Sequence, residues 1–379
     1  MSKIVEVVSG GLCTACGGCV GVCPYIKSIE DRVAVIEDCG VEGEGRCYYF
    51  CPRTFFDVDE MNGFVFGGRR SEEDVVLGRH ISVLAARAKS VAMRKNAQYG
   101  GVVSTIISHA LETGEIEAAV LTSGGGSCGS YDGGGGELLP TPVIARSKGD
   151  VLSCAKTKYF MGASLSALNK ALKEGFESVG VVGTPCQIQA LRKMQAYGDA
   201  VQSGGIYEKI DASKSVKLVV GLFCMWALSY DFLWYLRKHV ELSAVRKLDI
   251  PVGGFLVFGE DFRKELPLEE VRRYVRHACD VCYDMTSEFA DISVGALEGV
   301  PDWNTVILRT KLGERIFREA EKAGVLEVKE LEVERLEHLR WASLRKKAKA
   351  WRRMHEFKVE FLKISELERG IVEGFPLEE

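Results

Sequence analysis

Closely spaced cysteines near the N-terminus constrain this chain more than any other feature. Four of them follow the pattern C-x2-C-x2-C-x3-C, with Pro24 directly after the last: Cys13, Cys16, Cys19 and Cys23. This spacing lets a tight loop direct three sulfurs toward one cubane iron–sulfur cluster, while the fourth thiolate reaches a neighbouring cluster. The proline stops the turn from continuing as a helix. So short a segment buries little core, so we expect residues 1–60 to fold around their metal.

The first 4Fe–4S cluster is predicted to take its fourth ligand from farther along the chain. A Cys-x3-Cys-Pro sequence at Cys47, Cys51 and Pro52 repeats the end of the first motif. In the ferredoxin pattern, the last cysteine of each half binds the cluster of the other half. The predicted ligands of the first cluster are Cys13, Cys16, Cys19 and Cys51.

The second cluster of this ferredoxin-like module lacks one cysteine. Its expected ligands are Cys23, Cys39 and Cys47, which is one fewer than a 4Fe–4S cluster takes. An oxygen ligand, a three-iron form and the absence of a second cluster all stay open as alternatives. Structural zinc is a further alternative, and it suits this incomplete set better than the first. The candidate oxygen ligands are Asp38, Glu42 and Glu44.

The overall composition is that of an ordinary globular protein in a reducing compartment. The 379 residues are 46% hydrophobic and 27% charged, which suits two or three domains. Thirteen cysteines without an export signal indicate metal ligands rather than disulfides, so we expect a cytoplasmic protein of an anaerobe. The net charge of −4 argues against nucleic-acid binding. The longest apolar run, residues 218–228, is too short for a transmembrane segment.

Beyond residue 98 the hydrophobic pattern alternates between strands and helices. A helical pattern follows the glycine pair Gly100-Gly101, and a second helix is expected from Leu228 to His239. Short apolar runs between helical patterns predict buried strands at residues 118–121, 178–182, 217–223 and 290–294. The alternation predicts an α/β domain with a mostly parallel sheet.

Four segments are therefore expected. They are the ferredoxin-like module at 1–60, a linker and helix at 61–97, the α/β domain at 98–330 and a C-terminal helical arm at 331–379. A loop with many glycines, residues 122–136, is expected to be a surface excursion of the α/β domain.

A second set of cysteines is expected at one edge of the sheet. Cys186 follows one predicted strand through Gly-Thr-Pro, and Cys224 ends another. Both would lie at carboxyl ends of parallel strands, where open α/β sheets bind ligands. Cys279 and Cys282 form a C-x2-C just before a further strand. Together these four cysteines would hold a third 4Fe–4S cluster, so two or three clusters are expected in all.

Two alternatives compete with this third cluster. A single buried cysteine is usually a small hydrophobic residue, which is our interpretation of Cys128 and Cys154. Cys186 at a helix start would also suit a nucleophile. The spacing alone leaves both alternatives open.

At these residues the chain resembles the beta subunits of coenzyme F420-reducing hydrogenases and dehydrogenases. The likeness extends between residues 80 and 350, and its motifs occur in a fixed order. They are YGGVVST at 99–105, KTKY at 156–159, VGTPCQIQAL at 182–191, GLFC at 221–224, CDVC at 279–282, ADISVG at 290–295, WNTV at 303–306 and RT at 309–310. The departures are the glycine-rich insertion at 124–136 and the missing cysteine of the module.

The resemblance implies an FAD-containing α/β subunit that exchanges hydride with coenzyme F420. It also implies that Cys186, Cys224, Cys279 and Cys282 hold a 4Fe–4S cluster. The implied partners are the catalytic oxidoreductase subunits of a hetero-oligomeric complex, of the hydrogenase, formate dehydrogenase, heterodisulfide reductase or formylmethanofuran dehydrogenase type. The setting would be the methanogenesis-type metabolism of an archaeal anaerobe.

A flavin suits this role because a deazaflavin passes two electrons together as hydride, whereas a cluster accepts one at a time. The chain lacks a G-x-G-x-x-G fingerprint, which argues against an ordinary dinucleotide-binding fold. The glycine pair before a helix would instead contact the pyrophosphate. No protein acid or base is expected in the hydride step. The candidate FAD and F420 residues are Gly100, Gly101, Ser104, Lys156, Lys158, Tyr159, Gly183, Thr184, Pro185, Gln187, Asp291, Ser293, Asn304, Thr305 and Arg309.

The C-terminal arm carries a strongly basic stretch. Residues 340–353 include seven basic side chains and no acidic one. Trp341, Leu344, Ala348 and Trp351 recur at helical spacing, which predicts an amphipathic helix with a basic, solvated outer face. The alternative is that the basic residues contact a partner subunit or the negatively charged tail of F420.

The resulting hypothesis is an F420 oxidoreductase subunit that passes single electrons through its clusters. The rival within the same architecture is a ferredoxin-dependent flavin enzyme that reduces another organic substrate. A relay subunit without flavin is a third alternative.

Overall fold

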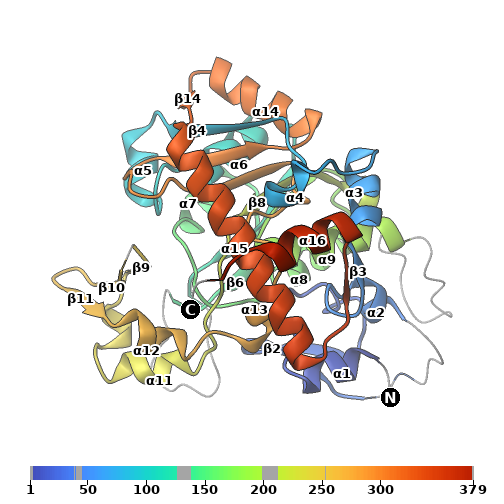
Figure 1. Ribbon diagram of the computed structural model, residues 1–379. Coiled ribbons are helices and arrows are strands. Elements are labelled where there is room, and N and C mark those ends of the chain that lie inside the picture. Colours follow the sequence, from blue (N-terminus) through green and yellow to red (C-terminus); the bar gives the residue numbers. More distant parts are fainter. Residues whose placement is uncertain are drawn as a thin grey trace.

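An eight-stranded sheet forms the centre of the computed structural model, which describes residues 3–37, 39, 45–125, 138–198, 212–251 and 253–377 (Figure 1). Its strand order is β14-β4-β13-β12-β8-β7-β5-β6. The strands are β4 (Ser82–Ala88), β5 (Ala118–Ser123), β6 (Thr141–Ala145), β7 (Val179–Gly183), β8 (Val216–Leu222), β12 (Ile292–Ala296), β13 (Asn304–Leu308) and β14 (Leu326–Glu330).

The sheet is mixed, so the prediction of a mostly parallel sheet is wrong. Only β5, β7, β8 and β12 pair in parallel, and every other pairing is antiparallel. The parallel strands are those that the sequence pattern predicted, because strands covered on both faces read as continuous apolar runs. Strand β4 lies inside the predicted linker 61–97, so that segment is part of the sheet.

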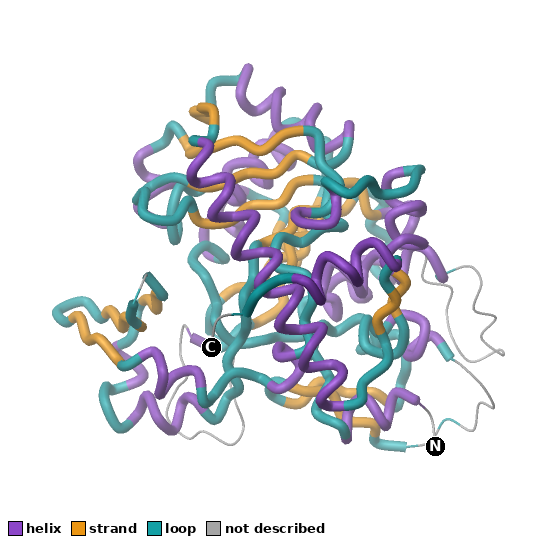
Figure 2. The backbone as a smooth tube through the Cα atoms, in the orientation of Figure 1, coloured by secondary structure: helices purple, strands orange, loops and turns teal. Residues whose placement is uncertain are grey.

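Helices cover both faces of the sheet. On one face α6 (Val102–Glu112) and α14 (Lys311–Lys322) pack with strand residues such as Leu121 and Val220. On the other face α8 (Leu165–Lys173) and α9 (Pro185–Tyr197) pack with residues such as Val120 and Val219. The alternation of neighbouring residues between the two faces follows from the two-residue repeat of a strand. The result is a three-layer arrangement (Figure 2).

The other described elements surround these layers. They are α1 (Lys3–Ser9), β1 (Ile26–Ile29), β2 (Arg32–Val35), α2 (Arg46–Phe50), β3 (Phe56–Asp57), α3 (Val58–Phe66), α4 (Asp74–Leu77), α5 (Val91–Asn96), α7 (Lys148–Ser153), α10 (Ala212–Ser215), α11 (Phe232–Arg237), the 3-10 helix η2 (Leu242–Ala244), β9 (Lys247–Asp249), β10 (Phe255–Phe258), β11 (Arg263–Leu266), α12 (Leu268–Arg272), α13 (His277–Asp280), α15 (Val333–Phe357), β15 (Leu362–Lys363) and α16 (Glu366–Gly374). Helix α11 is shorter than the predicted helix at 228–239. No helix in these described ranges combines the length and the apolar character that crossing a membrane requires.

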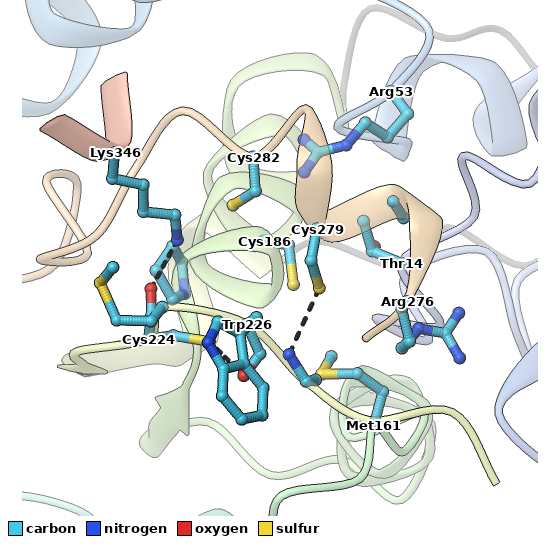
Figure 3. A pocket seen from close by; sticks show the side chains of 14 residues that line it. Thr14, Arg53, Met161, Cys186, Cys224, Trp226, Arg276, Cys279, Cys282 and Lys346 are labelled. Atoms are coloured by element: carbon cyan, nitrogen blue, oxygen red, sulfur yellow. Dashed lines mark hydrogen bonds between the residues drawn. The ribbon is translucent and has the colours of Figure 1, made fainter. Parts of the chain in front are cut away.

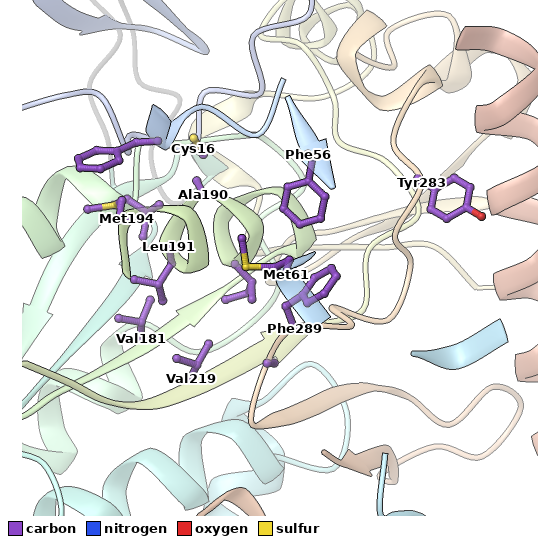
Figure 4. Packing of buried hydrophobic residues seen from close by; sticks show 14 of the residues in the cluster. Cys16, Phe56, Met61, Val181, Ala190, Leu191, Met194, Val219, Tyr283 and Phe289 are labelled. Carbon is purple, nitrogen blue, oxygen red and sulfur yellow. The ribbon is translucent and has the colours of Figure 1, made fainter. Parts of the chain in front are cut away.

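The N-terminal module shares a hydrophobic core with the sheet domain. Figure 4 shows Cys16, Phe56 and Met61 of the module region beside Leu191 and Met194 of α9, within one cluster of buried residues. At its far end, β3 of the module pairs in parallel with β15 of the C-terminal arm. The module is therefore built into the molecule, although its sequence suggested a separate unit.

Hydrogen bonds also fix the cysteine loop of the module to the sheet domain. The Leu165 amide donates to the Cys16 carbonyl at 3.0 Å. The buried Asn169 side chain donates to the Val20 carbonyl at 2.7 Å and to the Gly18 carbonyl at 3.3 Å. Because α8 carries these donors, the loop and the helix are positioned together.

At Gly17 the module packs tightly against the sheet domain. The φ of Gly17 is +86°, and an added Cβ would lie 2.5 Å from the Ala163 carbonyl oxygen. Gly67 shares the left-handed conformation, with φ +72°, but nothing lies within 4 Å of its added Cβ. Substituting each of these two glycines therefore distinguishes the cost of backbone strain, which both share, from the cost of a steric clash with Ala163, which only Gly17 has.

We expect Gly17→Ala to destabilise the protein more than Gly67→Ala does. Both variants strain the backbone by about 1 kcal/mol, but only Gly17→Ala also forces the module away from Ala163, which should add about 1–3 kcal/mol. Urea unfolding of the two variants measures the difference. Equal midpoints for the two would show that the module does not dock in this way.

Candidate functional site

The four cysteines predicted at the sheet edge line a single cavity (Figure 3). Cys186 lies in the first turn of α9, directly after β7, and Cys224 follows the end of β8. Cys279 lies on α13 and Cys282 just beyond its end. The cavity is also lined by the cations Arg53, Arg276 and Lys346, and by Thr14, Met161, Pro185, Met225, Trp226, Ala227 and Ala278.

Local sequence explains why Cys186 points into this cavity. Thr184 and Gln187 form a reciprocal capping box, and Pro185 occupies the first turn, so α9 begins at this point. The Gln187 side-chain amide donates to the Gly162 carbonyl at 3.1 Å and to the Ser164 hydroxyl at 3.0 Å. The predicted cofactor residues Gly183, Thr184, Pro185 and Gln187 thus position a cysteine.

Charge favours the thiolate at one of the four cysteines. Burial alone would raise the pKa of Cys282, but Lys346 and Arg53 outweigh burial and hold it below its usual value. Burial raises the pKa of Cys279 to about 11, with a further contribution from Cys282. The cavity therefore combines four mostly buried thiols with three cations, which is the environment that a negatively charged cluster needs.

Cys186 itself does not have the character of a nucleophile. Burial and the neighbouring Cys282 raise the pKa of its thiol, which disfavours the reactive thiolate. Cys154, the other cysteine that we interpreted as a hydrophobic residue, packs partly buried against the core. Cys128 lies outside the described residues.

Five of the module cysteines, Cys13, Cys19, Cys23, Cys47 and Cys51, lie in one cluster of packed side chains, and their division between two iron–sulfur clusters stays a prediction. Cys16 is buried, and the Cys51 and Cys13 thiols add to the effect of burial in raising its pKa. Burial raises the pKa of Cys47 to about 11, and Cys23 and Cys39 raise it further. The candidate oxygen ligands Asp38, Glu42 and Glu44 lie outside the described residues.

The first module group adjoins both of the other cysteine groups. Cys19 of this group and Cys47 of the second lie in one cluster of packed side chains. Thr14, between Cys13 and Cys16, lines the sheet-edge cavity.

Within the described ranges, no three or more His, Cys, Asp or Glu side chains are arranged around a single metal ion. The thiolates of an iron–sulfur cluster bind different iron atoms, so such a ligand set surrounds a volume rather than a point. The donor set of the cavity, with four thiols and three cations, fits that requirement.

Buried lysines support the backbone of a cysteine in two of the groups. Lys346 of α15 donates to the Cys224 carbonyl at 2.5 Å. Lys193 of α9 donates to the Cys51 carbonyl at 2.8 Å, and burial lowers its pKa to about 7. Helix α9 therefore carries Cys186 of the sheet-edge group and a support for the first module group.

Some of the predicted FAD residues meet at the start of α6. Gly101 is the N-cap with φ +75°, and the Asn304 side-chain oxygen accepts from the Val102 amide at 3.3 Å. A Cβ on Gly100 would lie 2.7 Å from that oxygen, so the glycine permits close packing. Ser104 lies in the first turn and is half-buried. The backbone amides of this turn suit a phosphate group.

The predicted KTKY segment lies next to this helix start. The Tyr99 hydroxyl donates to Asp249 at 2.8 Å, and the Gln98 side-chain oxygen accepts from the Thr157 amide. Lys156 has φ +71°, a conformation that lysine rarely adopts and that is enriched at functional sites. The Lys158 ammonium donates to three nearby carbonyls, those of residues 154, 155 and 156. Tyr159 packs edge-on against Phe255.

The other predicted FAD residues are engaged by protein partners. Asp291 accepts from the Val219 amide at 2.8 Å and pairs with Arg192. Arg309 is buried and donates to the Ser293 hydroxyl at 2.7 Å. Thr305 lies on β13 and donates weakly to a β12 carbonyl. Their direct contact with FAD stays a prediction.

The basic helix of the C-terminal arm differs from its prediction. Lys346 and Lys347 face inward, at 7% and 0% exposure, rather than forming part of a solvated face. Lys347 forms a buried ion pair with Glu288. These lysines could not be recognised by amphipathic spacing, because their burial depends on acidic and cysteine residues from distant segments.

Sequence reasoning missed four residues of the site: Arg53, Lys193, Arg276 and Lys346. Arg53 has a local signal, since it directly follows the Cys-Pro of the module. Arg276 stands three residues before Cys279, and its guanidinium donates to the Cys13 carbonyl at 2.7 Å. No sequence pattern distinguishes the other two from surface lysines.

Two family models match consecutive parts of the chain. Residues 83–169 match the N-terminal part, and residues 176–334 the C-terminal part, of the coenzyme F420 hydrogenase/dehydrogenase beta subunit. The chain is 33% identical to the beta subunit of coenzyme F420 hydrogenase from Methanothermobacter thermautotrophicus, over 68% of this chain and 87% of that subunit. It is 31% identical to a coenzyme F420-dependent sulfite reductase from Methanocaldococcus jannaschii, over 94% of this chain but only 53% of that protein.

A solved structure has the same fold. A chain of the F420-reducing nickel–iron hydrogenase complex from Methanosarcina barkeri superimposes with a TM-score of 0.66 at 32% sequence identity, over 74% of this chain and 93% of that chain. The match with the sulfite reductase includes the N-terminal module, since it covers nearly all of the present chain, which spans about half of that relative's length. From these matches, the chain belongs to the coenzyme F420 hydrogenase/dehydrogenase beta subunit family.

Proposed function

We propose that this chain is the F420-handling subunit of an oxidoreductase. It would exchange hydride between coenzyme F420 and FAD, and pass single electrons through 4Fe–4S clusters to or from a partner protein. The observation that carries this proposal is the meeting of Cys186, Cys224, Cys279 and Cys282 around one cavity beside the module. A family whose relatives are named for F420 supplies the choice of substrate.

The protein's own part is to hold donors and acceptors in a fixed order. At the cavity, four thiols from three segments would bind a 4Fe–4S cluster. Met161 and Trp226 add apolar side chains to the lining. Lys346 fixes the Cys224 backbone, and Arg276 connects the Cys13 carbonyl to the same region. Burial of these groups excludes water from the electron path.

The series of cysteine groups supports an electron path through the module. The sheet-edge group adjoins the first module group, which adjoins the second. An electron would therefore leave or enter through the N-terminal module, on the side of Cys47. Whether the second group holds a complete cluster depends on a fourth ligand, for which Asp38, Glu42 and Glu44 stay the candidates.

FAD would supply the conversion between hydride and single electrons. We assign its phosphates to the start of α6, with Gly100, Gly101 and Ser104, and we place Lys156 beside it. Asn304 holds this helix start against β13. Asp291, Ser293 and Arg309 would act indirectly, by fixing the loop between Cys282 and β12.

The partner would be a catalytic oxidoreductase subunit of the hydrogenase, formate dehydrogenase, heterodisulfide reductase or formylmethanofuran dehydrogenase type. A sulfite-reducing partner is a further candidate, because a relative that matches almost the whole chain is named as a sulfite reductase. The rival, a ferredoxin-dependent flavin enzyme for another substrate, shares the clusters and the flavin. Reduction of F420 by the protein with a low-potential one-electron donor would separate the two.

We expect reduced F420 to bleach the bound FAD rapidly, and NADH and NADPH to do so slowly or not at all. Anaerobic stopped-flow absorbance of the FAD-reconstituted full chain measures this choice directly. Protein without flavin is the blank for cluster absorbance. Fast flavin reduction by a nicotinamide, with none by F420, would contradict the proposal and leave only the architecture standing.

A matched pair of lysines sharpens this test. Lys156→Gln should weaken F420 binding, because the charge lies beside the proposed FAD site, whereas Lys170→Gln changes an exposed lysine on α8. The difference should shrink as salt rises, since the screening length falls from about 10 Å at 0.1 M to about 3 Å at 1 M. Equal binding by both variants would remove Lys156 from the site.

A further inference from the structure

Two cations at the sheet-edge cavity come from outside the part of the chain that matches the family models. Those matches cover residues 83–169 and 176–334. Arg53 belongs to the module and Lys346 to the C-terminal arm, and both line the cavity with the four cysteines. Figure 3 shows the two side chains reaching the cysteines from different sides.

Lys346 joins two cysteine segments. Its ammonium donates to the Cys224 carbonyl at 2.5 Å and to the Asp284 carbonyl at 2.8 Å, just beyond Cys282. An ammonium has three donors, so these bonds leave one for a group inside the cavity. With 7% exposure, the charge is poorly screened by solvent.

Arg53 is incompletely bonded. It is 4% exposed, and its Nε and Nη2 atoms have no hydrogen-bond partner in the part of the chain that the structure describes. Its Nη1 atom donates to the Pro52 carbonyl at 3.3 Å, and its guanidinium lies 4.8 Å from the centre of the Phe361 ring. Leaving buried donors without an acceptor costs free energy. The two unpaired nitrogens therefore indicate that an acceptor group occupies the cavity that Arg53 lines.

We propose that Lys346 and Arg53 together raise the reduction potential of the sheet-edge 4Fe–4S cluster. This inference rests on the proposed function, because it requires a cluster at the four cysteines. On reduction the cluster gains one electron from the flavin or from the module, and no bond to the protein breaks. The electron adds one negative charge to a buried group, and two nearby cations stabilise that charge.

The position of Arg53 links this effect to the module. Its backbone amide donates to the Cys51 sulfur at 3.4 Å, while its side chain reaches the sheet-edge cavity. Arg53 therefore contacts both cysteine groups, whereas Lys346 contacts the sheet-edge group. Lys346 should therefore raise the potential of the sheet-edge cluster above that of the first module cluster, so that electrons collect at the sheet edge.

The test is an anaerobic redox titration of the full chain, in which electron paramagnetic resonance measures how much of the cluster is reduced at each potential. Lys346→Gln and Arg53→Gln should each lower the equilibrium constant for reduction of the sheet-edge cluster by at least about tenfold, which is about 59 mV for one electron. Lys346→Arg and Arg53→Lys keep the charge and should restore most of the wild-type potential. Lys349→Gln and Lys27→Gln remove the same charge from exposed positions of the same two segments and should leave the potential unchanged.

The outcomes separate this inference from the proposed function. An unchanged potential in both neutral variants, with the cluster bound, would contradict it. Loss of the cluster from both would also contradict it, because the cations would then be needed for assembly rather than for the potential. If only one of the two neutral variants loses the cluster, the reduction potential of the other variant tests the inference. A wild-type chain without iron at the four cysteines would refute the proposed function instead.

Discussion

Replacing Cys186 or Cys279 by serine should remove about four irons per chain, the content of one 4Fe–4S cluster. The two residues line the same cavity from α9 and α13, so either change breaks the same ligand set. The module should keep its own iron, because its expected cysteine ligands lie between Cys13 and Cys51 and include neither Cys186 nor Cys279. Iron and sulfide analysis of anaerobically purified protein measures the loss.

Cys154→Ser is the matched control for this experiment. Cys154 is a partly buried cysteine that packs against the core on α6's side of the sheet. The Cys154→Ser protein should contain as much iron as the wild type. Wild-type iron in the Cys186→Ser and Cys279→Ser variants would leave both residues as packing thiols and remove the basis of the electron path.

Replacing Glu368 by alanine should destabilise the fold by about 3–5 kcal/mol, because it breaks a buried ion-pair network and leaves Arg70 and Lys347 each with one carboxylate instead of two. Glu368 is fully buried on α16 and forms ion pairs with Arg70 and, at 3.6 Å, with Lys347. It also accepts from the Tyr283 hydroxyl at 2.9 Å. Burial alone would raise the pKa of Glu368, but the two cations outweigh burial and hold it below its usual value.

Chemical unfolding followed by circular dichroism measures this change. Glu366→Ala is the control, since Glu366 is an exposed acid on the same helix and should cost less than about 1 kcal/mol. Similar costs for the two variants would show that the buried network does not hold the C-terminal arm. A cost confined to Glu368→Ala would place the arm among the elements that stabilise the loop after Cys282.

Local patterns predicted the parts of the structure that depend on neighbouring residues. The strands before Cys186 and Cys224 read as continuous apolar runs, and a strand that ends at a known residue places that residue at the sheet edge. The division of the module cysteines between two clusters, which is also expected from their spacing, stays a prediction. The start of α6 was predicted from a glycine pair before a helical pattern.

Features that depend on distant contacts escaped prediction. Strand β4 lies at the interior of the sheet, yet its antiparallel pairing with β13 and β14 involves residues more than 200 positions away. The inward turn of Lys346 depends on cysteines of three other segments and on the Asp284 carbonyl. Periodicity treats a lysine as a surface residue, so it cannot identify one that is stabilised by buried negative charge.

The pairing of β3 with β15 joins segments that lie far apart in the chain, and this has a consequence for the order of folding. The ribosome makes β15 long after the cysteine module. Contacts between such distant segments form late, because closing a long loop costs entropy before any contact compensates for it. The β3 side of the module should therefore stay accessible until β15 has been made, whereas the cysteine loop can already pack against α8.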